Sequence, residues 1–186
     1  MRSNLHLAAV VLVAVALLAG CTDPVAALPP VDVTGLADIY AEDLTAFDMA
    51  LTDRGGLVDL EGGYASSRDG THLALYTAPT RPLDDAAHAR GVVGITALFA
   101  TDVFERWPGL TSFDVCQEVH TGTFGSDAQP TRSQVTLTRE VAASIDWDTV
   151  TLEELMAAAR RDETSRVLLD RDLQLHLDIT ASDDGD

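Results

Sequence analysis

Two stretches of alternating apolar and polar residues constrain the fold of this chain more than any other feature. Between 112 and 120, one set of alternate positions holds Phe113, Val115 and Val119, and the other holds Asp114, Cys116, Glu118 and His120. From 135 to 147 every odd position is apolar except Arg139. Successive side chains of a strand point to opposite faces. Each stretch therefore predicts a strand with one buried and one solvated face, which is typical of an antiparallel sheet.

The residues before these strands predict a helix and a hairpin. Apolar residues recur at helical spacing over 35–53, and Gly55-Gly56 follows as a helix end would require. Alternating residues around 58–64 and 72–75 flank the sequence Ser67-Arg68-Asp69-Gly70, whose Asp-Gly pair favours a tight turn. These two segments are expected to pair as an antiparallel hairpin.

A long buried helix is predicted in the middle of the chain. Asp84 is a suitable N-cap, and the helix would run to about Arg106 before Trp107-Pro108-Gly109 stops it. Its centre, 92–100, is apolar on nearly every side, which is typical of a buried helix. A strand over Val92–Ile95 is the competing interpretation, but the length of the segment favours a helix.

The last elements complete the predicted fold. Thr151-Leu152-Glu153-Glu154 forms a capping box that opens a short helix to Arg161, and alternation over 172–179 predicts a final strand. The predicted class is α+β: an antiparallel sheet of about five strands, with helices packed mainly on one face, after an N-terminal signal helix. We expect one domain over 34–180, followed by an acidic tail at 181–186.

The N-terminus carries a short apolar run. Twelve apolar residues, Leu7 to Leu18, follow Arg2 and lead into Ala19-Gly20-Cys21. As a helix this run would span about 18 Å, whereas the apolar core of a bilayer is about 30 Å thick. The run is therefore short for a transmembrane helix and suits the core of a signal peptide.

The sequence Leu18-Ala19-Gly20-Cys21 resembles the lipobox of prokaryotic lipoprotein precursors. The resemblance implies that Cys21 takes a diacylglyceryl group and that the signal peptide, 1–20, is removed. Residues 21–33, with three prolines, would then form a short tether to the outer face of the cell membrane. An uncleaved anchor and an ordinary secretory signal are the alternatives.

The charge of the chain excludes some partners. There are 30 acidic residues and 12 basic ones, all arginine, which gives a net charge of −18. Such a surface repels nucleic acids and anionic lipid headgroups. Acid excess without lysine resembles secreted proteins of salt-loving archaea, and a GC-rich genome that replaces Lys with Arg is the alternative. The first interpretation predicts that the melting temperature climbs between dilute buffer and molar salt.

Cys116 is the first candidate for a nucleophile. His120 shares its strand face, but four strand residues place it about 13 Å away, too far for a dyad. The neighbouring Asp114 and Glu118 disfavour a thiolate. The sequence therefore predicts a structural cysteine. If Cys21 carries a lipid, Cys116 has no disulfide partner; otherwise a Cys21–Cys116 bridge is conceivable.

Metal binding and serine chemistry are not favoured. Glu118 with His120, and His176 with Asp178, would form two pairs on strand faces, but no metal motif has this spacing. Ser112 lacks the glycine context of a nucleophile elbow. We therefore predict no catalytic residue, no cofactor-binding residue and no metal ligand.

The sequence favours a lipid-anchored, extracytoplasmic binding or accessory module without enzymatic activity. It would contact the membrane through the lipid on Cys21 and bind another envelope protein or a solute, with no nucleic-acid partner. One alternative is an extracytoplasmic enzyme, such as a metal-assisted hydrolase around His120 and His176. The other is a structural envelope protein that self-associates.

Overall fold

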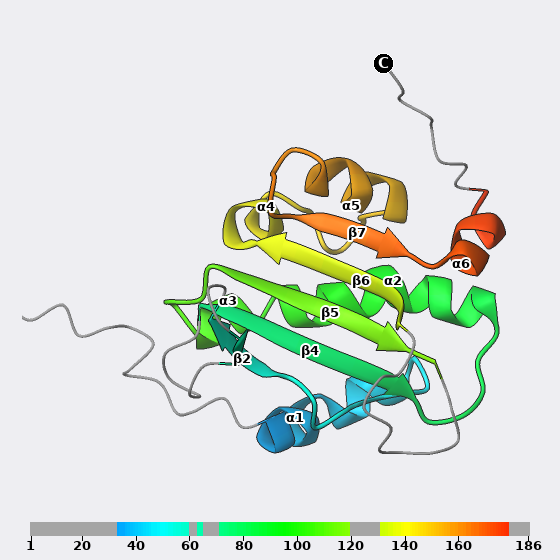
Figure 1. Cartoon of the computed structure of the whole chain (residues 1–186), viewed down its shortest axis with the longest axis horizontal. Helices are drawn as coiled ribbons and strands as arrows, with labels where there is room; N and C mark the ends of the chain where they lie inside the picture. Colours follow the sequence, from blue (N-terminus) through cyan, green and yellow to red (C-terminus); the bar gives the residue numbers. More distant parts are fainter. Residues whose placement is uncertain (1–32, 60–62, 65–70, 120–130, 179–186) are drawn as a thin grey trace, which may run out of the picture.

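The computed structural model of the chain describes residues 33–59, 63–64, 71–119 and 131–178 (Figure 1). Several features predicted from the sequence lie outside them: the signal peptide 1–20, Cys21, most of the tether, the turn Ser67–Gly70, His120 and the tail 181–186. The described residues form one sheet with helices, so the α+β class is confirmed.

Seven strands make up this sheet. They are β1 (Met49–Leu51), β2 (Gly56–Asp59), β3 (Gly63–Tyr64), β4 (His72–Pro79), β5 (Ser112–Glu118), β6 (Thr131–Thr138) and β7 (Arg166–Leu169). The order is β3-β2-β4-β5-β6-β7, and β1 also pairs with β4. The long strands β4, β5 and β6 therefore lie in the middle, as Figure 1 shows.

The sheet is mixed, so the prediction of a purely antiparallel sheet is wrong. β4 and β5 run parallel, with Leu73 beside Phe113, while the other strand pairs are antiparallel. The chain leaves β4 at Pro79 and enters β5 at Ser112. Two helices fill this crossover, which is long enough to return the chain to the same end of the sheet.

The helices are α1 (Val33–Thr45), α2 (Asp85–Ala100), α3 (Val103–Arg106), α4 (Arg139–Ala143), α5 (Leu152–Ala159) and α6 (Arg171–His176). In Figure 1, α2 crosses behind the strands. The ring of Tyr40 on α1 packs edge-on against Phe99 on α2, with centroids 4.8 Å apart. Both α5 and α6 contact α2 as well. These contacts join α1, α5 and α6 to the helical layer on one side of the sheet. Within the described residues, no helix is long and apolar enough to cross a membrane.

The crossover confirms the predicted start of the buried helix and corrects its end. The Asp84 side chain accepts a hydrogen bond from the Ala87 amide at 2.8 Å and caps α2. The helix is interrupted at Thr101–Asp102, so 84–106 holds two helices instead of one. Gly91 allows α2 to lie close to β5, because a Cβ there would come within 3.1 Å of the Gln117 side chain.

The first helix is shorter than the sequence predicted. It ends at Thr45 instead of 53, and the chain turns at Asp48, whose φ is 55°. Aspartate tolerates this left-handed conformation better than most residues do. The turn sends Met49–Leu51 into β1, where Leu51 pairs with Thr77. The apolar residues of this turn and of β1 continue the helical spacing of α1 by coincidence.

The long strand predicted over 135–147 is also wrong beyond its first residues. β6 ends at Thr138, whose side chain caps α4. Arg139 does not point inward from a strand. Its guanidinium donates to the backbone carbonyls of Phe104, Trp107 and Leu110, at 3.1, 2.9 and 2.7 Å. These bonds hold α3 and the loop after it against the end of β6. No pattern among neighbouring residues predicts this contact.

The C-terminal strand predicted over 172–179 is a helix. Asp170 caps α6 by accepting a hydrogen bond from the Leu173 amide at 2.8 Å. The final strand comes earlier, as β7, and pairs antiparallel with β6. The capping box at Thr151 is confirmed, because Thr151 and Glu154 bond reciprocally at the start of α5.

The predicted hairpin is correct in part. β2 pairs antiparallel with β4, with Leu57 opposite Leu73. Tyr64 does not continue β2 as predicted; it lies in β3, which folds back so that Tyr64 pairs with Val58.

Candidate functional site

The two sides of the sheet carry different side chains. On β5, Phe113 packs against Phe104 of α3, with ring centroids 5.5 Å apart, so the odd positions face the helices. The even positions, among them Ser112 and Asp114, face the other way. No helix of the described residues lies over them, and we call this side the helix-free face. Figure 1 views the strands from this side.

The helix-free face is not solvated at β5, contrary to the prediction from the sequence. Asp114 is 7% exposed, Cys116 4% and Glu118 2%. A polar group buried without hydrogen bonds costs free energy, and a buried charge costs more. The partners of these residues therefore decide what the face can do.

Four side chains form a connected cluster on the helix-free face, and we call it the His72 cluster. His72 on β4 and Ser112 on β5 lie beside each other, and His72 Nδ1 is 2.8 Å from Ser112 Oγ. His72 Nε2 is 3.7 Å from Asp114 Oδ2. Gln134 on β6 donates from Nε2 to the same Asp114 oxygen at 2.7 Å. The cluster thus crosses the three central strands.

Asp114 is incompletely paired. Among the residues that the structure describes, its Oδ1 has no hydrogen-bond partner, although the atom is buried. Thr136 lies directly opposite Asp114 on β6, and its buried Oγ1 likewise has no partner within the described ranges. Glu118 differs, because its carboxylate forms an ion pair with Arg54. Burial raises the pKa of Glu118, and the Arg54 charge and hydrogen bond partly reverse that rise.

Cys116 is a buried structural cysteine, as the sequence predicted. Burial, with further contributions from Asp114 and Glu118, raises the pKa of its thiol to about 12. The thiol therefore stays protonated at neutral pH, and a protonated thiol is a poor nucleophile.

The helix-free face becomes more accessible toward β7. Asp114 on β5 is buried, Gln134 on β6 is half-buried, and Leu168, opposite Gln134 on β7, is 49% exposed. Arg166, two residues before Leu168, is exposed as well. A molecule that reaches the His72 cluster across the described residues would therefore approach over β7.

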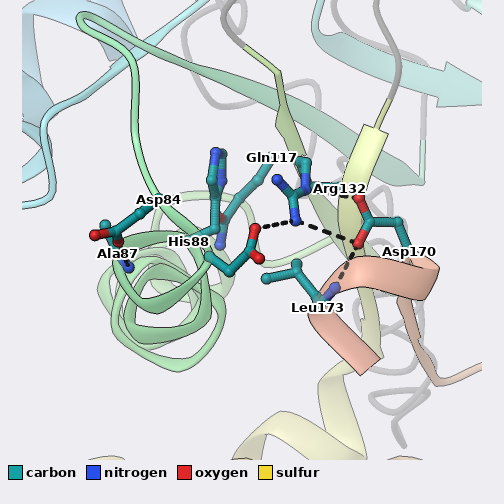
Figure 2. A network of polar contacts seen from close by, with 8 residues as sticks. Asp84, Ala87, His88, Gln117, Arg132, Asp170 and Leu173 are labelled. Carbon is teal, nitrogen blue, oxygen red and sulfur yellow. Dashed lines mark hydrogen bonds and ion pairs between the residues drawn. The ribbon is translucent and has the colours of Figure 1, made fainter. Parts of the chain in front are cut away.

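A second polar cluster lies on the helix side, and Figure 2 shows it. Arg132 donates to Asp85 Oδ1 at 2.7 Å and pairs through Nε with Asp170 Oδ2 at 2.6 Å. Asp170 also caps α6 through the Leu173 amide. The register of the β5–β6 pairing shifts at Gln117/Glu118, next to Arg132. Through its bonds to Asp85 and Asp170, Arg132 ties the start of α2 to β6 and α6.

His88 and Gln117 complete this second cluster, which we call the Arg132 network. His88 Nδ1 is 3.4 Å from Gln117 Oε1, and both side chains are buried, at 2% and 1% exposure. Burial lowers the pKa of His88, and the bond to Gln117 partly opposes it. The bond to Arg132 lowers the pKa of Asp85. A neutral histidine and an arginine bound by two carboxylates suit a scaffold that holds α2 and α6 on the sheet.

The described residues do not assemble the metal site weighed as an alternative. His176 and Asp178 are exposed, at the end of α6 and just beyond it, instead of on a strand. Glu118 is buried on the helix-free face with Arg54. Within the part of the chain that the structure describes, no three His, Cys, Asp or Glu side chains converge to hold a metal ion. His120 and Cys21 lie outside it.

Sequence reasoning missed the His72 cluster. His72 and Ser112 are separated by 40 residues and meet because β4 and β5 are parallel neighbours. In the sequence, Ser112 has no local motif around it, and His72 begins a predicted strand without any mark of a site. Since the pairing of distant strands is not a local property, no short-range signal would have found the cluster.

No family model matches the chain, and neither a curated protein nor a solved structure matches it.

Proposed function

We propose that this protein is a lipid-anchored, extracytoplasmic binding module that takes its ligand on the helix-free face. The short apolar run and the sequence Leu18-Ala19-Gly20-Cys21 support the anchor. The net charge of −18 supports a partner other than nucleic acid. Another envelope protein or a solute would be the ligand.

One observation favours the helix-free face as the binding site. Asp114 Oδ1 and Thr136 Oγ1 lie on neighbouring strands at paired positions, and both are buried with no hydrogen-bond partner in the part of the chain that the structure describes. Each such atom costs about 1–3 kcal/mol, and a charged one costs more. A ligand that donates hydrogen bonds, or that carries a positive charge, would recover this cost. The Arg132 network has no comparable charge without a counterion.

Site-specific photo-crosslinking in the native host tests the face. A photoreactive amino acid would replace Leu168, which is 49% exposed next to the His72 cluster. The matched control replaces Leu175, which is 65% exposed on α6 and belongs to the helix side. We expect a defined adduct from position 168 and none from 175, and its mass would identify a protein or a solute. No adduct at 168, or equal adducts at both positions, would contradict the proposal.

The anchor is tested separately. Cys21→Ser removes the thiol that the lipid requires, so we expect the protein to leave the membrane fraction and to change in mass. Unchanged retention and unchanged mass would rule out the lipid without affecting the crosslinking result.

A further inference from the structure

We infer that Ser112 is an activated nucleophile, with His72 as its general base and Asp114 as the group that orients His72, and that it attacks the carbonyl of an ester. This inference rests on the proposal that the helix-free face takes a ligand, and it gives that face an activity. Its basis is the arrangement of three buried side chains on two parallel strands.

The geometry assigns the proton positions. A carboxylate only accepts hydrogen bonds, so the ring nitrogen that faces Asp114 is best protonated. That nitrogen is His72 Nε2, at 3.7 Å from Asp114 Oδ2. In neutral His72 the other nitrogen, Nδ1, must then accept, and Ser112 Oγ at 2.8 Å is its donor. The hydroxyl proton of Ser112 therefore already points at a base.

Gln134 completes the arrangement. It donates to Asp114 Oδ2 at 2.7 Å and holds the carboxylate toward His72. A nucleophile within hydrogen-bond reach of a base that a third group orients is the signature of covalent catalysis, and distances are often longer without substrate. The ring nitrogens have exchanged roles relative to serine proteases, in which Nε2 faces the serine.

Another buried serine shows what a structural serine looks like in this fold. Ser133 on β6 pairs with Gln117 on β5 and is 2% exposed, like Ser112. Its Oγ has no hydrogen-bond partner among the described residues. The two serines thus have the same burial in adjacent strands, but only Ser112 is bonded to a histidine.

The reaction needs no group beyond the ester and water. Ser112 Oγ bonds to the ester carbonyl carbon while its proton moves to His72 Nδ1. The bond to the alkoxy oxygen breaks, and the alcohol leaves with the proton from His72. Water then attacks the acyl-serine, gives a proton to His72 and releases the acid as that proton returns to Ser112 Oγ.

Labelling of the full chain with diisopropyl fluorophosphate tests the inference. Ser112 Oγ would bond to phosphorus and expel fluoride, and peptide mass spectrometry would place the adduct. We expect one adduct, on Ser112. Protein unfolded in denaturant should not react. Because the wild-type chain is measured directly, no variant has to fold for this test.

Variants assign the roles. Ser112→Ala should abolish the adduct, and the control Ser133→Ala should leave its rate unchanged. His72→Gln should slow labelling by about 100-fold or more, and Asp114→Asn by about tenfold or more. No adduct on folded wild-type protein, or an unchanged rate in His72→Gln, would overturn the inference. A crosslink from position 168 without an adduct would refute the nucleophile and leave the binding face standing.

Discussion

The two polar clusters of this protein lie on opposite sides of one sheet and differ in how their charges are balanced. In the Arg132 network, two aspartates share one arginine, and the histidine is buried next to a neutral amide. In the His72 cluster, one Asp114 oxygen has the Gln134 amide at 2.7 Å and His72 Nε2 at 3.7 Å, and the other has no hydrogen-bond partner among the described residues. The charges of the Arg132 network are paired, as a structural scaffold requires. The His72 cluster leaves one carboxylate oxygen available for a further hydrogen bond.

The difference matters because burial makes unbalanced charge expensive. Removing one partner of a buried ion pair costs about 3–5 kcal/mol, a large part of a typical domain stability of about 5–15 kcal/mol. Sequences keep such costs chiefly where binding or chemistry uses them. An unbalanced carboxylate beside a histidine and a serine therefore distinguishes the helix-free face from the helix side.

The largest effect is expected from Arg132→Ala. The substitution leaves Asp85 and Asp170 without their cation and unties α2 from α6. Because both aspartates keep contact with water, we expect a loss of about 2 kcal/mol, less than for a fully buried pair. Urea denaturation would measure it. The control Arg81→Ala breaks the exposed pair with Asp48 and should change nothing measurable; equal losses in both variants would show that the network is not a scaffold.

Asp114→Asn should stabilise the protein, in contrast to Arg132→Ala. It keeps the shape of the side chain and removes a buried charge that no arginine of the described residues neutralises, so we expect the free energy of unfolding to rise by about 1 kcal/mol. Glu118→Gln on the same face is the control. It deprives Arg54 of its counterion and should lower stability. Destabilisation by Asp114→Asn would show that the Asp114 charge is balanced in the folded protein and would contradict the difference between the two clusters.

The smallest effect is a pH dependence from His88. Its pKa is lowered in the folded protein, so on acidification the unfolded chain takes up this proton first. Stability should therefore fall slightly as the pH drops through the ordinary histidine value of 6.5. His88→Gln should flatten this slope between pH 7.5 and 5.5 in denaturation series, whereas the exposed His176→Gln should not. If stability depends on pH as steeply in His88→Gln as in the wild type, another group takes up the proton.

Local patterns identified several elements correctly. The Asp84 cap, the capping box at Thr151 and the alternation over 112–118 each depend on neighbours within a few residues, and all three are present. The same approach failed at 46–53, 139–147 and 172–178. Apolar spacing persisted by coincidence beyond the turn at Asp48 and the cap at Thr138, and the alternation over 172–178 falls on a helix that Asp170 caps.

The sequence by itself determined the class of the fold, the start of the buried helix and the net acidic charge, because each follows from composition or from residues close in the chain. Only the tertiary structure decided that β4 and β5 run parallel, that the polar side of β5 is buried, and that Arg132 gathers two aspartates. It also decided that His72, Ser112 and Asp114 meet. These facts depend on which distant strands pair and in which register, and that choice is made by the packing of the whole core.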